Sequence, residues 1–494
     1  MIHVGVRPPT GSVTENALVL GVYRGTRRLS VVASRLDRSF GGVAALLMDG
    51  FKADRGETRI ASLKRGRRLV HTVLLGLGDR TQANAENLAD AAGVAARLLI
   101  THRAPSVAVY LDDTVAGTLD AGAAAHAMAK AFGLATYRVG KSPAASLTRA
   151  TLLCAQPARS ISPHLRRAQQ LVAWMTRVRD WVNQPANVLT PSVFTDDARS
   201  ALVKHGLRCR VLTERAIAQE GMNGVLAVGG GSRQAPRFLI AEYGMANTRR
   251  PLVCLVGKGV MFDSGGISIK PWEHMHEMKS DMAGAASVLA ATSLAAQSKL
   301  PLRVVALAPC VENMPGGGAF RPGDVITLAS GKTVEVLSTD AEGRLILADA
   351  VAYAKSHYRP DVIVDMATLT GGVLIALGTR IAGIMGNSPR DIDDMRAAGD
   401  RSGEPVWPLP LDDRFEAMIK GDVSDYKNYG GRNASPITAG ALIGTSAGTT
   451  RWVHIDIAGS SWNDGTGPGY QTRGATASGV DLLLRYLEIL AARG

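Results

Sequence analysis

The chain lacks the apolar segments that membrane proteins and secreted proteins need. Its 494 residues contain no apolar run of about 18 residues, so we expect no transmembrane segment. The N-terminal segment MIHVGVRPPTGSVTE has proline, threonine and glutamate where a signal peptide needs an apolar stretch. The sequence therefore predicts a cytoplasmic protein without a membrane partner.

Cysteine and aromatic residues are also scarce. The four cysteines, at positions 154, 209, 254 and 310, lie far apart, and no pair has the spacing of a zinc finger or a redox motif. We interpret them as buried free thiols in a reducing compartment. Aromatic residues make up only 5% of the chain, whereas glycine occurs 54 times. Small side chains are typical of tightly packed α/β layers.

The length and the order of apolar segments indicate two α/β domains. A chain of 494 residues exceeds the usual size of one domain. Residues 1–162 alternate short strands and helices and predict a small N-terminal α/β domain, and residues 163–182 predict a linking helix. Residues 183–494 alternate again and predict a larger second α/β domain with a central, mostly parallel sheet. The clearest expected elements are strands at Ala17–Tyr23, Val70–Leu77, Ser106–Leu111, Pro251–Gly257 and Asp361–Met366, and helices at Ala83–Thr101, Gly122–Phe132, Ala283–Gln297 and Leu345–Tyr358.

Positive charge is concentrated at the N-terminal end of the chain. The net charge is +13, and residues 1–165 hold 21 Lys and Arg against 11 Asp and Glu, while the remainder holds 35 against 32. A solvated basic surface that aids solubility is the simpler explanation. Binding of nucleic acid through this surface, which includes Lys64–Arg68, is the alternative.

A first cluster of reactive residue types lies between positions 257 and 281. The apolar strand Pro251–Val256 runs directly into Gly257-Lys258-Gly259, and Asp263, Lys270 and Asp281 follow. Sites in parallel sheets gather at the carboxyl ends of strands, so this segment is well placed for chemistry. The glycines beside Lys258 allow the backbone to turn tightly next to a ligand.

A second cluster is Ser338–Leu345, with the sequence STDAEGRL. If this segment is extended, Asp340, Glu342 and Arg344 point to one side. Arg344 also precedes a predicted helix, whose N-terminus favours an anion.

The two clusters together offer four carboxylates, those of Asp263, Asp281, Asp340 and Glu342. Burial of four negative charges without cations would be very unfavourable, and two divalent cations would balance them. Oxygen ligands suit Mg²⁺ or Mn²⁺, and Zn²⁺ also fits. Two metal ions about 3.5–4 Å apart can activate a water molecule and polarise a carbonyl group together.

Each of these residues taken alone has a simpler explanation. Asp281 could cap the following helix, Asp340 could close a turn, and Lys258 could be a surface lysine. Two short windows that hold all the parts favour the metal site. His274–Glu277 lacks the H-E-x-x-H spacing, and Ser264 lacks the G-x-S-x-G frame, so a zinc-histidine site and a serine hydrolase are disfavoured.

These segments resemble the leucyl aminopeptidase family of two-metal metallopeptidases. The family signature NTDAEGRL stands here as Ser338–Leu345, with serine in place of asparagine. The first cluster is similar to the family segments GKGxxFDSGGxxxK and MKxDMxGAA. The resemblance covers residues 180–494, and the further matching segments are Asn183–Pro191, Glu312–Val325, Ala367–Gly371 and Val453–Ser460.

The resemblance implies a ligand set for the two metal ions, which would be Mn²⁺ or Zn²⁺ or, alternatively, Mg²⁺. The implied ligands are Lys258, Asp263, Asp281, Asp340 and Glu342, with Asp263 and Glu342 bridging the two ions. A lysine ligand has to be a neutral amine, so the cations should lower its pKa strongly.

The resemblance also implies the roles of residues that do not bind metal. Lys270 would stay charged and stabilise the oxyanion of the tetrahedral intermediate. Arg344 would hold a bicarbonate ion that acts as the general base, and Leu369 would help to shape that anion site. Met278 would line the pocket for the first side chain of the substrate.

The function implied is release of single N-terminal residues, such as Leu or Met, from peptides with a free amino end. The resemblance further implies a homohexamer. The alternative is an additional or main role as a DNA-binding regulator, in which the basic N-terminal domain binds DNA weakly.

Overall fold

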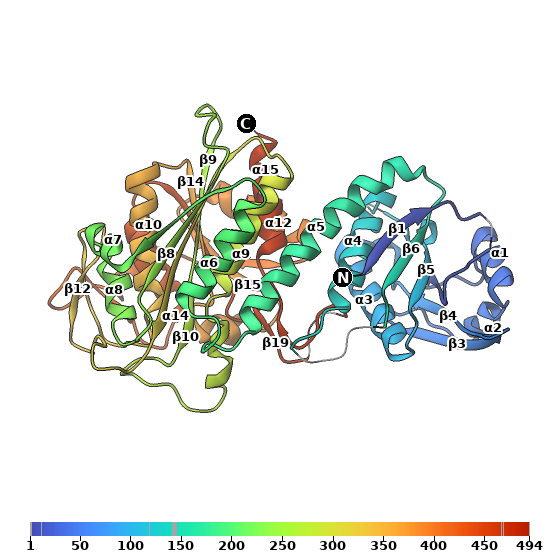
Figure 1. The fold of residues 1–494 in the computed structure, drawn as a ribbon, viewed down its shortest axis with the longest axis horizontal. Coiled ribbons are helices and arrows are strands. Elements are labelled where there is room, and N and C mark those ends of the chain that lie inside the picture. The colour runs from blue at the N-terminus through green and yellow to red at the C-terminus, as the bar shows by residue number, and fades with distance from the viewer. Residues whose placement is uncertain are drawn as a thin grey trace. The chain divides into compact units, whose positions relative to one another are not determined.

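The computed structural model describes residues 2–10, 12–117, 119–140, 146–465, 467 and 469–493. The chain forms two compact units (Figure 1). Unit 1 consists of the chain up to Thr176 together with Asp464–Arg473, and unit 2 consists of Arg177–Asn463 and the chain from Gly474 onward. The prediction of a smaller N-terminal α/β domain before a larger one is confirmed. No helix in the described ranges is both long enough and apolar enough to cross a membrane.

Unit 1 contains a six-stranded sheet in the order β1-β6-β5-β2-β4-β3. All neighbouring strands are parallel except β3 and β4, which form an antiparallel hairpin. The strands are β1 (His3–Arg7), β2 (Ala17–Val22), β3 (Thr58–Arg65), β4 (Arg68–Gly76), β5 (Ser106–Tyr110) and β6 (Arg149–Leu153). Strands β2 and β5 are buried along their whole length, which agrees with their continuous apolar sequences.

The helices of unit 1 are α1 (Val31–Phe40), α2 (Ala44–Met48), α3 (Ala85–Thr101) and α4 (Ala121–Ala135). Helices α3 and α4 pack against each other, and most of the residues that they bury are alanine or glycine, in agreement with the expected small side chains. The long helix α5 (Ala158–Asn183) begins earlier than the predicted start at Pro163, and the boundary between the units lies inside it. The four cysteines are free, and only Cys209 is partly exposed.

Unit 2 contains a nine-stranded sheet in the order β16-β15-β18-β14-β9-β11-β8-β7, with β10 paired to β11. The centre of this sheet is parallel, because β18, β14, β9 and β11 all run in the same direction. The strands are β7 (Arg208–Thr213), β8 (Arg237–Tyr243), β9 (Leu252–Gly257), β10 (Gly259–Asp263), β11 (Arg303–Asn313), β14 (Val362–Ala367), β15 (Ala382–Gly386), β16 (Val406–Pro408) and β18 (Arg451–Asp456). The parallel centre brings the carboxyl ends of four strands to one edge, which is where the functional residues lie.

The helices of unit 2 include two that are buried on nearly every side, α9 (Ala283–Gln297) and the first three turns of α10 (Gly343–Tyr358). Helix α9 packs on β9 and β11, and α10 packs on α14. The remaining helices of unit 2 are α6 (Pro191–Val203), α7 (Glu214–Gln219), α8 (Asn223–Gly229), α11 (Gly371–Leu377), α12 (Pro389–Ser402), α13 (Asp413–Ala417), α14 (Ser435–Ala447) and α15 (Val480–Ala491), with a short 3₁₀ helix at Met275–Ser280. The 3₁₀ helices at Arg80–Gln82 and Asp112–Thr114 belong to unit 1. Two small sheets complete the fold, one of β12 (Val325–Thr327), β13 (Thr333–Glu335) and β17 (Tyr426–Lys427), the other of β19 (Trp462–Asn463) and β20 (Gly474–Ala475).

Candidate active site

Lys258 directly follows β9, where two close approaches of the backbone enclose it. A Cβ atom on Gly257 would lie 2.5 Å from the Ala285 Cα atom of helix α9, and one on Gly343 would lie 2.8 Å from the Lys258 Nζ atom. Glycine at both positions therefore lets α9 and the start of α10 approach the lysine. The Lys258 side chain is almost completely buried as a result.

The buried Lys258 ammonium group lies between two carboxylates. Its Nζ atom is 2.7 Å from the Asp281 Oδ2 atom and 2.8 Å from the Glu342 Oε1 atom. It also donates a hydrogen bond to the Thr368 carbonyl oxygen at 3.1 Å. Although burial alone lowers the pKa of Lys258, the charges of Asp281 and Glu342 raise it above its ordinary value.

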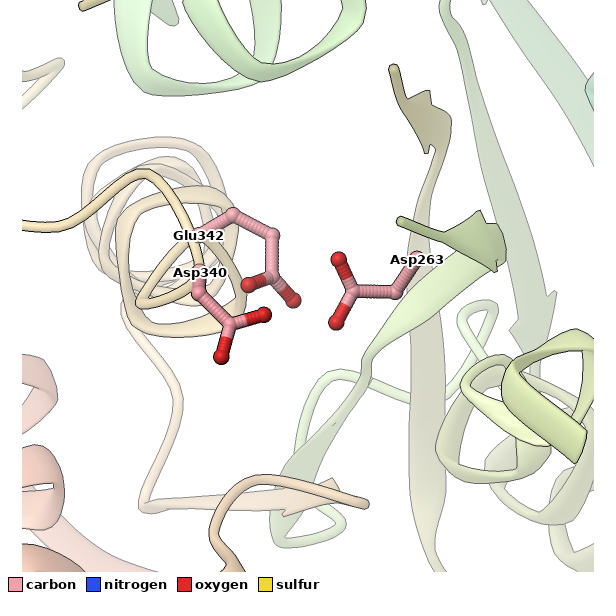
Figure 2. A group of neighbouring side chains, drawn as sticks. All are labelled: Asp263, Asp340 and Glu342. Atoms are coloured by element: carbon pink, nitrogen blue, oxygen red, sulfur yellow. The ribbon is translucent and has the colours of Figure 1, made fainter. Parts of the chain in front are cut away.

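Three carboxylates converge beside this lysine. One oxygen atom from each of Asp263, Asp340 and Glu342 lies within 4.8 Å of the others. Figure 2 shows Asp340 and Glu342 on one segment, with Asp263 facing them from the opposite side. Asp263 and Glu342 are buried, whereas the Asp340 side chain is 39% exposed. The fourth expected carboxylate, that of Asp281, joins the group through Lys258.

The segment around Asp340 is not extended. The expectation that an extended conformation points Asp340, Glu342 and Arg344 to one side is therefore wrong. Asp340 lies in a turn, Glu342 has helical dihedral angles at the cap of α10, and Arg344 lies inside the helix. Asp340 and Glu342 converge because the chain bends between the turn and the helix. The simple explanation of Asp281 as a helix cap is also wrong, since Met282 precedes α9 and no side chain caps it.

Lys270 brings a second positive charge to the carboxylates. Its Nζ atom lies 2.8 Å from the Asp263 Oδ2 atom and also contacts the Asp340 carboxylate. Burial lowers the pKa of Lys270, but the Asp263 and Asp340 charges outweigh burial and raise it. Lys258 therefore contacts Asp281 and Glu342, whereas Lys270 contacts Asp263 and Asp340, so the two lysines share no carboxylate.

The carboxylates of this group are difficult to ionise together. Burial is the largest cause that raises the pKa of Asp281, Glu342 and Asp340. The like charge of Asp263 raises all three further, and the nearby lysines only partly compensate. The group therefore favours additional positive charge.

Arg344 lies in the first turn of α10 and is almost completely buried. Within the described part of the chain, its Nε and Nη1 atoms have no hydrogen-bond partner. Burial lowers the pKa of Arg344 to about 10, against the raising effect of Glu342 and Asp456. A buried guanidinium group with free donors is suited to hold an anion.

The two remaining predicted residues flank this centre. Met278 is partly buried in the 3₁₀ helix Met275–Ser280, directly before Asp281. Leu369 follows β14, and its backbone N–H donates to the Asp456 Oδ1 atom at 3.1 Å. A cavity of about 1090 Å³ lies beside the 3₁₀ helix Met275–Ser280. Its lining includes Met275 and Lys279 of this helix, together with Phe262 and Met314.

Sequence reasoning missed three residues that hold the site together. Asn313 donates to the Asp263 Oδ1 atom at 2.8 Å and to the Thr339 carbonyl oxygen at 3.0 Å. Thr368 donates to the Asp281 Oδ1 atom at 2.7 Å, and Asp456 holds the turn that follows Thr368. All three, Asn313, Thr368 and Asp456, lie inside segments that carry the family resemblance, which was the available signal.

Comparison with known proteins gives matches over both units. The family model described as the cytosol aminopeptidase family, catalytic domain, matches residues 176–484, and the model of that family's N-terminal domain matches residues 19–142. A probable cytosol aminopeptidase of Syntrophotalea carbinolica is 39% identical over 499 residues, which cover 99% of each chain. Another, from Geotalea uraniireducens, is 42% identical over 421 residues, or 84% of each chain.

A solved structure is similar over nearly the whole chain. The bottromycin maturation enzyme BotP in complex with Mn is 32% identical, with a TM-score of 0.85, and the match covers 97% of this chain and 100% of BotP. Both domains of one family are matched in order, and the relatives align along almost the full length. The chain therefore belongs to the cytosol aminopeptidase family, the leucyl aminopeptidases, and is an aminopeptidase.

Proposed function

We propose that this aminopeptidase uses two divalent cations to release single residues from peptides with a free amino end. The observation that carries the proposal is the carboxylate group of Asp263, Asp340 and Glu342, whose oxygens lie within 4.8 Å of one another and of which Asp263 and Glu342 are buried. Burial and mutual repulsion raise the pKa values of Asp281, Asp340 and Glu342, and divalent cations would relieve both effects. The residues present therefore fit a metal centre.

The proposed ligands fall into two positions. Lys258 and Asp281, whose Nζ and Oδ2 atoms lie 2.7 Å apart, would hold one cation. Asp340, which contacts Lys270, would hold the other. Glu342, which contacts Lys258, and Asp263, which contacts Lys270, would be shared by the two cations. When bound, the two cations would supply an activated water molecule and a polarised scissile carbonyl group.

Lys258 has to lose a proton before it can act as a ligand. Its pKa is raised by Asp281 and Glu342, while burial acts in the opposite direction. Cations that neutralise those carboxylates would leave burial as the dominant effect, which favours the neutral amine. We infer that metal binding releases this proton.

Mn²⁺ and Zn²⁺ suit this set of oxygen and nitrogen donors, and Mg²⁺ is a third choice. The similar enzyme BotP is in complex with Mn. We propose Mn²⁺ or Zn²⁺ as the working metals of this chain.

Lys270 and Arg344 are the proposed catalytic residues. Lys270 keeps its charge because Asp263 and Asp340 raise its pKa, and it would stabilise the developing oxyanion. The unpaired donors of Arg344 would hold bicarbonate, which would supply a general base. Leu369 would shape this anion site.

The partly buried Met278 would line the pocket for the first side chain, which supports a preference for Leu, Met and similar residues. We also propose a homohexamer and a cytoplasmic location, on the strength of the family resemblance and the names of the relatives. The comparisons give no support to the DNA-binding alternative. Several arginines of unit 1, including Arg7, Arg59 and Arg68, instead bond to groups of the same unit.

The test is hydrolysis of a panel of aminoacyl amides with Mn²⁺, Zn²⁺, Mg²⁺ or a chelator. We expect metal-dependent release of Leu or Met, and no turnover of the same substrates after acetylation of the amine. Equal activity after exhaustive dialysis against chelator would contradict the proposal. Light scattering should give a mass of about six times 52 kDa.

A further inference from the structure

Among the described residues, the turn between β14 and α11 makes hydrogen bonds to Lys258 and Asp281 within the carboxylate group. The Thr368 carbonyl oxygen accepts a hydrogen bond from the Lys258 Nζ atom at 3.1 Å. The Thr368 hydroxyl donates to the Asp281 Oδ1 atom at 2.7 Å. One residue therefore orients both side chains that we assign to the first metal position.

The conformation of this turn depends on Asp456, a fully buried residue at the end of β18. Its Oδ1 atom accepts hydrogen bonds from the backbone N–H groups of Leu369 and Ala458, both at 3.1 Å. Its Oδ2 atom accepts from the Thr370 hydroxyl at 2.7 Å. The carboxylate thus holds the backbone and a side chain directly after Thr368.

The strand register explains why Asp456 reaches the turn. Strands β14 and β18 are parallel neighbours, and Asp456 pairs with Ala367, the last residue of β14. The Ile457 N–H donates to the Ala367 carbonyl oxygen at 2.8 Å. Asp456 therefore lies at the level where the chain leaves the sheet for the turn.

A buried polar pair on the same strands supports Asp456 from behind. His454, two residues earlier on the same face of β18, has its Nδ1 atom 2.5 Å from the Asp365 Oδ1 atom. The Trp452 Nε1–H donates to the other Asp365 oxygen at 2.6 Å. Burial raises the pKa of Asp456, and the nearby His454 opposes this effect. The layer behind Asp456 is thus fixed in orientation by these two contacts.

We propose that Asp456 is a positioning residue for the metal position of Lys258 and Asp281. By fixing the turn, it presents the Thr368 carbonyl to Lys258 and the Thr368 hydroxyl to Asp281. Among the described residues this turn makes no hydrogen bond to Asp340, so the position of Asp340 is expected to be independent of Asp456. This inference rests on the proposed two-metal function.

The experiment measures Mn²⁺ binding by the full-length protein, with calorimetry for affinity and electron paramagnetic resonance for the coupled ion pair. The variants are Asp456→Asn and Thr368→Val, and the second changes no charge. We expect two Mn²⁺ ions and a coupled signal in the unsubstituted protein. Each variant should keep one ion and bind the other about 10–100-fold more weakly, the usual effect of removing a partner behind a ligand. The coupled signal should give way to that of isolated Mn²⁺.

Asp349→Asn is the matched control. Asp349 is also a buried aspartate of unit 2 that accepts backbone hydrogen bonds, from Val225 at 3.0 Å and Ala329 at 2.8 Å, but it does not contact the turn. This variant should keep both ions even where its thermal stability changes.

Each outcome separates the inference from the function on which it rests. If the unsubstituted protein binds fewer than two ions, the two-metal function itself is wrong. If it binds two, and Asp456→Asn binds two with unchanged affinity or loses both equally, the positioning role is overturned. Should Asp456→Asn fail to fold, the same two results with Thr368→Val decide.

Discussion

Units 1 and 2 both contain a largely parallel sheet with polar residues at the carboxyl ends of its strands. The charged side chains there are exposed and paired in unit 1, whereas in unit 2 they are buried and incompletely compensated. In unit 1, a pocket of about 210 Å³ after β2 and β4 is lined by Arg24, Asp79 and Gln82. Arg24 is paired with Asp54, and both side chains are more than half exposed, at 58% and 53%. Exposed pairs of this kind contribute little free energy.

In unit 2, the same edge of the sheet carries charge that is buried and incompletely compensated. Asp263 and Glu342 are buried beside Asp281, and the Arg344 guanidinium group has unpaired donors. Strand topology places both sets of residues at the ends of strands. Only the burial of uncompensated charge, however, favours the binding of cations and anions. Buried charge without full compensation therefore marks the site in unit 2, because strand topology alone does not distinguish the two units.

The largest effect is expected from the bridging carboxylates. Asp263→Ala and Glu342→Ala should lose metal and activity together, because each would contact both cations. The rate should fall by more than the factor of about 10³ that removal of one oxyanion donor causes. Metal content and turnover of a leucine amide measure the effect, and retention of both ions with full activity would contradict it.

Lys270→Ala and Arg344→Ala should keep both metals and react about 10²–10³-fold more slowly, because each removes one charged group from the reaction and no ligand. Arg210→Ala is the control. This exposed arginine of unit 2, on β7, donates to the Tyr353 hydroxyl at 2.9 Å, away from the site. Its rate should stay within about twofold, since surface changes away from a site have small effects. Empty metal positions in Lys270→Ala would refute the assignment.

Removal of metal should destabilise unit 2 and leave unit 1 unchanged. A cation present at 100 times its dissociation constant stabilises the folded state by about 2.7 kcal/mol. Hydrogen exchange with and without chelator should therefore show faster exchange in β9 and β14 of unit 2, and no change in β2 and β4 of unit 1. Equal acceleration of exchange in both units would contradict the assignment of the metal site to unit 2.

The stability of unit 2 should also fall as the pH rises toward neutrality, because of Asp349. Burial raises the pKa of Asp349 to about 7, against an ordinary value of about 3.9. Between these values the folded chain retains a proton that the unfolded chain has lost, so stability falls with increasing pH by up to about 1.4 kcal/mol per pH unit. Denaturant titrations of the metal-loaded protein from pH 5 to 7 measure the slope, which Asp349→Asn should reduce.

The smallest effect is expected from the basic surface of unit 1. Lys64→Glu with Arg67→Glu should change the free energy of unfolding by less than about 0.5 kcal/mol and leave peptidase activity unchanged, because both residues are exposed. A gel-shift series should show no retardation of DNA at physiological salt, where binding to phosphates alone is weak. Tight binding to one DNA sequence under these conditions would restore the regulatory alternative.

The sequence predicted the elements of the fold well where apolar runs were continuous. The strands at Ala17–Tyr23 and Asp361–Met366 appear as β2 and β14, because parallel strands buried on both faces have uninterrupted apolar sequences. The start of α5 was missed, since residues 158–162 precede a proline and carry no clear periodicity. Residues 464–473 belong with unit 1 although they lie near the end of the chain, and no local pattern indicates such a return.

By itself, the sequence determined the α/β class, the family and the two segments that carry the reactive side chains. These features depend on residue type and short-range spacing, which a single chain displays directly. Only the tertiary structure decided how the side chains meet. Lys258 lies between Asp281 and Glu342, and Thr368 and Asp456 support them, although these residues are separated by up to 198 positions between Lys258 and Asp456. The physical reason is that parallel strands distant in sequence end at one edge, and only their packing with α9 and α10 excludes water and makes the charges interact strongly.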